Sequence, residues 1–125
     1  MKVTHPPQSH KDERGEITDV LTKESIEYVT LIMSAKGATR GNHYHKETVQ
    51  SVYLLEGKMK LLTRMPDQPV VSTVLEKGDL AVTNHMEEHA MIALVDSAFM
   101  VFTRGLRGGE NYEKDTYRLA EPLHE

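Results

Sequence analysis

The chain has no cysteine and no tryptophan, and only two of its 125 residues are phenylalanine. Without cysteine there can be no disulfide, no thiolate metal site and no cysteine nucleophile. Hydrophobic residues make up 38% of the chain, and because large aromatic side chains are scarce, the core must consist mainly of Val, Leu, Ile and Met. Such a core suits a narrow barrel better than a broad multilayer fold.

Long apolar runs and basic clusters are also missing. No stretch approaches the ~20 consecutive apolar residues of a membrane-spanning helix, and residues 1–10 are polar, unlike a secretory signal. Lysine and arginine are dispersed and outnumbered by acidic residues, which gives a formal net charge of −4. A nucleic-acid-binding surface would show a basic patch. We therefore expect a cytoplasmic protein that binds neither nucleic acid nor a membrane.

What the sequence does contain is a series of short β-like runs separated by turn residues. Many short strands at close spacing predict an all-β barrel or sandwich, and the length suits a single domain, 1–125. We expect an irregular arm over 1–16, a barrel over 17–103, and a loop and tail over 104–125. A helix is the competing interpretation of Ser34–Lys46 and of Met86–Leu94; the second segment has helix formers but lacks a clean apolar stripe, so we interpret it as a loop followed by a strand. The expected strands are Ile17–Leu21, Tyr28–Ser34, His43–His45, Val49–Leu55, Lys58–Thr63, Val70–Leu75, Leu80–Thr83, Ala90–Val95 and Phe99–Thr103.

Histidines and one glutamine form the most informative pattern. His43 and His45 are two residues apart, so on a strand they point to the same face. Gln50 lies beyond a probable bend, and His89 begins a later apolar strand that could lie beside the first. Buried imidazoles are costly unless they have partners, so we expect a functional cluster. Three imidazoles and a carboxamide oxygen also suit a divalent metal ion.

The spacing of these residues resembles a known motif. Residues 37–57 read GATRGNHYHKETVQSVYLLEG and resemble the first cupin motif, G-x5-H-x-H-x4-E-x6-G, with Gln50 in place of the glutamate. Residues 78–93 resemble the second cupin motif only at Gly78 and His89. The resemblance implies a single-domain jelly-roll barrel, also called a double-stranded β-helix, with the three histidines and Gln50 lining its mouth.

A narrower similarity concerns Arg40-Gly-x-His43-x-His45-Lys-x3-Gln50. It resembles the RmlC-like cupins that act on nucleotide sugars, in particular the WxcM-like or FdtA-type 3,4-ketoisomerases of dTDP-4-keto-6-deoxyglucose. The related 3,5-epimerases share R-G-x-H. The segments Asp12–Gly15 and Tyr112–Arg118 are similar to that family as well. The resemblance implies a dimeric sugar isomerase of carbohydrate biosynthesis that works with histidines and requires no cofactor.

The chemistry suggests a role for each residue. Moving a keto group requires a base with a pKa near neutrality, which histidine provides; we assign His43 as base and His45 as acid or enolate stabiliser. A guanidinium matches phosphate oxygens, so Arg40 is a candidate diphosphate ligand. Gln50 would orient either His43 or a substrate hydroxyl, and His89 would contact substrate.

Two other functions remain open at this point. The set His43, His45, Gln50 and His89 could hold Zn, Ni, Fe or Mn, which would make the protein a dioxygenase or a metal-dependent isomerase. A barrel mouth can also serve as a non-catalytic small-molecule binding module. Glu87 and Glu88 flank His89, and we expect both to be solvated. The apolar strand Tyr28–Met33 would leave an edge that needs covering, which predicts a homodimer.

Overall fold

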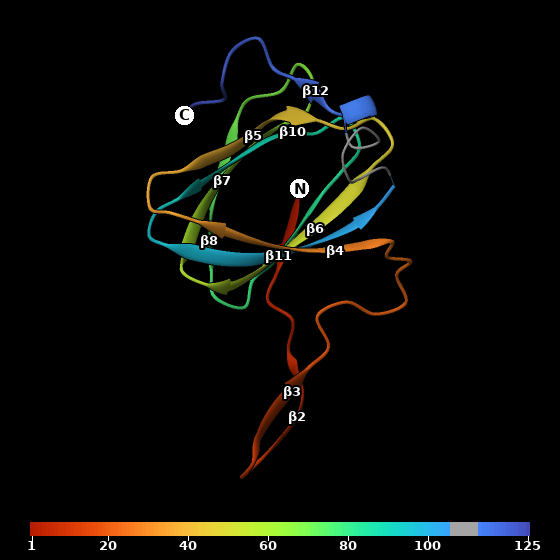
Figure 1. Cartoon of the computed structure of the whole chain (residues 1–125), viewed down its shortest axis with the longest axis vertical. Coiled ribbons are helices and arrows are strands. Elements are labelled where there is room, and N and C mark those ends of the chain that lie inside the picture. Colours follow the sequence, from red (N-terminus) through yellow and green to blue (C-terminus); the bar gives the residue numbers. More distant parts are fainter. Residues whose placement is uncertain (106–112) are drawn as a thin grey trace.

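The structure, a computed structural model, describes residues 1–105 and 113–125, whose strands form two large antiparallel sheets facing each other and a separate hairpin (Figure 1). The fold is an all-β jelly-roll barrel, as the sequence predicted. The first sheet has the order β1 (Lys2–Thr4), β9 (Leu80–Thr83), β6 (Val49–Glu56), β11 (Ser97–Arg104) and β4 (Tyr28–Ser34). The second has the order β12 (Tyr117–Arg118), β5 (Thr39–Tyr44), β10 (Glu88–Ala93), β7 (Lys58–Arg64) and β8 (Val71–Glu76). The hairpin pairs β2 (Gln8–Asp12) with β3 (Gly15–Thr18).

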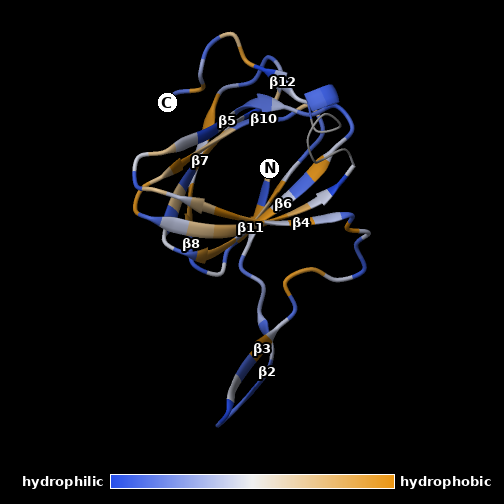
Figure 2. Cartoon of the chain, viewed as in Figure 1, coloured by the Kyte–Doolittle hydropathy of each residue, from blue (hydrophilic) through white to orange (hydrophobic). Residues whose placement is uncertain are grey.

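The core lies between the two large sheets. Strand side chains alternate between the two faces of a sheet, and β11 shows this alternation clearly, with Phe99 and Val101 buried and Met100 between them half-buried. Leu54 and Leu61 meet them from β6 and β7 in the same buried cluster. Figure 2 shows these strands as largely hydrophobic, whereas the projecting hairpin is mostly hydrophilic. The core is thus built from aliphatic side chains and a single buried phenylalanine among the described residues, as the composition indicated.

Most strand predictions are confirmed, but that of Ile17–Leu21 is wrong beyond Thr18, where β3 ends. Tyr28–Ser34 and Leu80–Thr83 have the predicted bounds. The helical interpretations of 34–46 and 86–94 are wrong, because β5 and β10 occupy those segments. β5 begins at Thr39, earlier than predicted, since its first residues are polar and leave no hydrophobic signal.

The expectation that residues 1–16 are irregular is wrong. β1 pairs with β9 in the first sheet, and Val3 packs against the core. Pro6 and Pro7 lie between β1 and β2, where no ladder bond is needed. Polar β2 carries no apolar alternation, so only its pairing with β3 shows it to be a strand. Of the predicted loop and tail over 104–125, residues 117–118 form β12, and residues 106–112 lie outside the described residues.

The C-terminal segment is fastened to the outer face of the second sheet. Leu123 is buried against Leu62 and Ala90. The backbone N–H of Leu123 donates to the side-chain oxygen of Asn42 at 2.8 Å, and the N–H of Leu119 donates to the Asn42 carbonyl at 2.9 Å. These contacts tie the end of the chain to β5, the strand that carries the predicted site. Within the described residues, no helical segment has the length and apolar character needed to cross a lipid bilayer.

Candidate functional site

A backbone irregularity in β5 brings the first predicted histidine opposite the third. His43 pairs with His89 across the ladder, and the register shifts between His89 and Ala90. Gly41 and Asn42 have φ values of 93° and 57° at this point, a region that glycine and asparagine tolerate best. A Cβ atom on Gly41 would lie 2.8 Å from the carbonyl oxygen of His89. Glycine is therefore required both by the local conformation and by the close approach of β10.

The structure brings the three predicted imidazoles together. The ring centroid of His43 lies 4.9 Å from that of His45 and 4.7 Å from that of His89, and the remaining pair is 5.5 Å apart. One ring nitrogen from each histidine falls within 4.8 Å of the others. His45 and His89 are buried, while His43 is half-buried. The cluster therefore has one ring that is more accessible than the other two.

Backbone carbonyls hold the two buried rings. Nδ1 of His45 donates to the carbonyl oxygen of Asp115 at 2.8 Å, and Nδ1 of His89 donates to the carbonyl oxygen of Glu87 at 3.1 Å. A carbonyl oxygen can only accept, so in both rings the proton is on Nδ1. In the neutral ring, Nε2 is then the nitrogen with the lone pair, which is the form that accepts a proton or binds a metal ion.

Burial keeps His89 neutral. The pKa of His89 is lowered to about 4, chiefly because the ring is desolvated and to a smaller extent because of the nearby His45, while the hydrogen bond to the Glu87 carbonyl and the charge of Glu87 act in the opposite direction. Because the charged form loses hydration on burial, the neutral ring predominates near pH 7. His89 is thus suited to hydrogen bonding and not to donating a proton as an imidazolium.

His43 and His89 border a cavity of about 230 Å³ between the sheets. His45 lies behind the lining, with an exposed fraction of 3%. Gln50, on the opposite sheet, lines the cavity and is only 7% exposed. Apolar side chains form much of the cavity wall, and the polar groups come from a few lining residues. The lining consists of Ile32, Arg40, Gly41, His43, Gln50, Val52, Leu61, Thr83, His89, Met91 and Val101.

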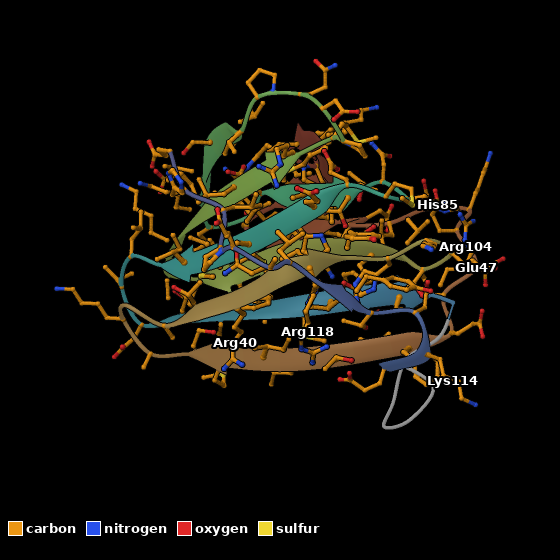
Figure 3. All side chains as sticks on the ribbon, turned by 90° about the horizontal axis from the view of Figure 1, so that it is seen from above. Arg40, Glu47, His85, Arg104, Lys114 and Arg118 are labelled. Atoms are coloured by element: carbon orange, nitrogen blue, oxygen red, sulfur yellow. The ribbon has the colours of Figure 1, made fainter. Side chains whose placement is uncertain are left out.

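Arg40 lines the same cavity from β5 and links the two sheets. Its Nε donates to the Ser34 hydroxyl at 2.7 Å, and one terminal nitrogen donates to the Met33 carbonyl at 3.0 Å. Figure 3 shows Arg40 at one end of the barrel, and Glu47, His85 and Arg104 at the other. A guanidinium has five N–H donors, so these two bonds leave donors for a ligand.

Sequence reasoning missed two acidic residues at the site. Glu87 was expected to be solvated but is 3% exposed; it accepts the backbone N–H of Asn84 at 3.0 Å and pairs with the amino group of Met1. Asp115, 4% exposed, holds the segment after His45. Both depend on contacts between distant parts of the chain. In the sequence, only the similarity of residues 112–118 to the 3,4-ketoisomerases pointed to this region, and that similarity assigned no role to Asp115.

Comparison with known proteins supports the same fold. A family model described as the polysaccharide biosynthesis C-terminal domain matches residues 10–106. QdtA, a sugar 3,4-ketoisomerase from Thermoanaerobacterium thermosaccharolyticum solved in complex with TDP, is 21% identical, with a TM-score of 0.78 over 95% of this chain and 88% of that one. No curated protein sequence matches significantly.

Epimerases of sugar nucleotides share the architecture as well. The dTDP-4-dehydrorhamnose 3,5-epimerase from Sulfolobus tokodaii is 19% identical, with a TM-score of 0.72 over 89% of this chain and 72% of that one. The rmlC epimerase of Mycobacterium tuberculosis is 17% identical, with a TM-score of 0.77 over 94% of this chain and 67% of that one. The chain therefore has the RmlC-like cupin fold, as its motifs indicated.

The lowered pKa of His89 predicts a pH-dependent stability. Between about pH 4 and the ordinary value of 6.5, the unfolded chain binds a proton that the folded chain rejects, so stability falls as the pH falls. Histidine 89 should account for a loss of about 2 kcal/mol between pH 7 and pH 5. Urea unfolding at both pH values should show this loss in the wild type and in the exposed control His124→Gln, but not in His89→Gln. Equal losses in all three proteins would contradict the assignment.

Proposed function

The chain belongs to the polysaccharide biosynthesis C-terminal domain family, and from this premise we propose that it isomerises a keto sugar carried on a nucleoside diphosphate. The observation that supports the proposal is a cavity in which His43 and His89 face Gln50, with Arg40 on the same wall. Two similar structures are a sugar 3,4-ketoisomerase with TDP and a dTDP-sugar epimerase. Their activities agree with the chemistry that the histidine cluster offers.

The reaction we propose is a shift of the keto group to the neighbouring carbon. His43, the most accessible ring, takes the proton from the carbon beside the carbonyl, and the C–H electrons form the double bond of an enediolate. The adjacent hydroxyl then loses its proton and becomes the new carbonyl, while the double-bond electrons take up a proton at the former carbonyl carbon and the former carbonyl oxygen is protonated to a hydroxyl. Atoms and electrons balance without an external oxidant or reductant.

The remaining residues bind and orient the sugar. The neutral ring of His89 donates its Nδ1 proton in a hydrogen bond to the Glu87 carbonyl, and it therefore offers Nε2 as an acceptor for a substrate hydroxyl. His45 is held in the same tautomer, so we assign it to stabilise or protonate the enolate oxygen in its imidazolium form, with a second proton on Nε2. Gln50 orients a hydroxyl from the opposite sheet, and Arg40 binds the diphosphate.

The isomerase proposal predicts solvent exchange beside the carbonyl. Incubation with dTDP-4-keto-6-deoxyglucose in deuterium oxide should place deuterium next to the carbonyl and produce the 3-keto isomer. NMR of the product measures both changes. His43→Asn should reduce kcat by about 10² to 10⁴-fold, the usual contribution of a general base, whereas exposed His124→Asn should not. Binding of the nucleotide sugar without exchange would overturn this proposal in favour of a non-catalytic binding module.

A metal-dependent cupin is the second candidate, because three histidine nitrogens lie within 4.8 Å of one another. The donor set fits a divalent ion: both buried rings have their proton on Nδ1, held by a backbone carbonyl, as histidine ligands usually do. His43, His45 and His89 would hold Zn, Ni, Fe or Mn, with Gln50 as a neutral fourth ligand. Such an ion would polarise a bound carbonyl, in a metal-dependent isomerase or a dioxygenase.

The metal proposal predicts measurable and tunable binding. Titration of the chelator-treated protein with each of these ions should show one site per chain, and Gln50→Glu should tighten it because a carboxylate adds a negative charge. Thr83→Val, beside Gln50 in the same sheet and lining the same cavity, is the matched control and should leave the affinity unchanged. Absence of binding in both wild type and Gln50→Glu would eliminate this candidate, and unchanged affinity in Gln50→Glu would remove Gln50 from the ligand set.

We also propose that two copies of the chain associate through the face of β4. Val29, Leu31 and Met33 are 59%, 57% and 66% exposed, and they lie on the last strand of the first sheet. The hairpin β2–β3 projects from the barrel (Figure 1) and carries Ile17 at 59% exposure. Apolar surface of this kind on a sheet edge is typical of a self-association site.

This association should be sensitive to a charge on β4. Light scattering after gel filtration should give a dimer for the wild type and a monomer for Leu31→Lys, because a lysine would have to be desolvated in the contact. Val71→Lys on β8, with a similar original exposure of 55%, is the matched control and should remain dimeric. A monomeric wild type, or a dimer that only Val71→Lys disrupts, would contradict the proposed surface.

A further inference from the structure

Asp115 combines deep burial with an unusual number of hydrogen bonds. One carboxylate oxygen accepts the backbone N–H of Lys46 at 3.0 Å, and the other accepts the N–H groups of Glu47 and Thr48 at 3.0 and 2.8 Å. These three N–H groups follow one another directly after His45, where the chain leaves β5 and turns toward β6. Without an acceptor, buried backbone donors are costly, so the carboxylate replaces the ladder that ends there.

The same residue also contacts the imidazole. The backbone carbonyl of Asp115 accepts the Nδ1 proton of His45 at 2.8 Å, while its side chain holds the three residues that follow His45. We propose that Asp115 is a positioning residue: its carboxylate fastens the segment 46–48, and this places its own carbonyl where it determines the tautomer and orientation of the His45 ring.

The charge state of Asp115 suits this role. Burial alone would raise the pKa of the carboxyl, but hydrogen bonds from the Thr48 side chain and from the backbone N–H groups of residues 46–48 outweigh it and lower the pKa below its ordinary value. The group is therefore ionised at neutral pH, and charge-assisted hydrogen bonds to a carboxylate are stronger than neutral ones. A neutral amide at this position could not reproduce the arrangement, because it has one acceptor oxygen in place of two.

The segment around Asp115 is itself anchored, so the carbonyl is held from both sides. Tyr117 stacks on Tyr44 with ring centroids 5.2 Å apart, and the Lys46 ammonium lies 4.5 Å from the Tyr117 ring centroid. Arg118 forms two hydrogen bonds with the Glu113 carboxylate, each 3.0 Å long. The His45 ring thus rests on a short, fixed stretch of the C-terminal segment, and a displaced ring would disturb its contacts with His43 and His89.

The first test measures the His45 tautomer without any substrate. Long-range ¹H–¹⁵N NMR distinguishes Nδ1-protonated from Nε2-protonated histidine. We expect the Nδ1-protonated form in the wild type and a mixture, or the other tautomer, in Asp115→Asn. Asp79→Asn is the matched control, because the Asp79 carboxylate also accepts a backbone N–H, that of Glu76 at 2.8 Å, but contacts none of the three site histidines. An unchanged His45 tautomer in folded Asp115→Asn would overturn the proposal.

A second variant covers the case in which Asp115→Asn does not fold. Thr48→Val removes the hydroxyl that hydrogen-bonds the carboxylate while keeping a similar shape, and it should shift the tautomer in the same direction by a smaller amount, whereas Thr48→Ser should restore the wild-type signal. No shift in Thr48→Val would then count against the proposal, and so would a failure of Thr48→Ser to restore the signal.

Activity provides a separate readout, which rests on the proposed function. Loss of a group that orients a functional histidine costs about 10 to 100-fold, so Asp115→Asn should lower kcat by that factor with little change in KM. A lowered Tm with unchanged kcat would indicate a merely structural residue and would overturn the proposal. If the wild type shows no isomerase activity, the proposed function fails, while the tautomer measurement still decides the role of Asp115.

Discussion

The organisation of the site depends on where two buried imidazoles place their Nδ1 protons. His45 and His89 each donate that proton to a backbone carbonyl, from Asp115 and Glu87 respectively. A buried ring without such a partner would be expensive, and a ring with it presents its other nitrogen as an acceptor. The hydrogen bonds therefore decide both that the histidines can be buried and what chemistry they can perform.

The barrel supplies the frame for this arrangement. β5 and β10 approach closely because Gly41 has no side chain, and their pairing sets His43 opposite His89. The other sheet contributes Gln50 and an apolar wall. A cavity that is mostly apolar with a few convergent polar groups is typical of a small-molecule site, and burial lowers the pKa of His89, which favours the neutral form of that ring.

Acidic residues outside the cavity act on it through the backbone. Glu87 and Asp115 both bind backbone N–H groups with their side chains and a histidine with their carbonyls. This pairing allows each carboxylate to position an imidazole through the backbone, and the charge of Glu87 also acts to raise the pKa of His89. The imidazoles that perform the chemistry are thus distinct from the acidic residues that position them. Such a separation agrees with a fold that carries different activities on the same scaffold.

The sequence by itself determined the all-β fold, the shared face of His43 and His45, and the spacing that places Gln50 and His89 with them, because these follow from local alternation and from a motif. It did not reveal that β1 joins the core sheet, that Glu87 is buried, or that Asp115 holds His45 from 70 positions along the chain. Those features arise only when distant segments meet, since burial, tautomer and pKa depend on the neighbours that folding supplies and not on the residues beside them in sequence.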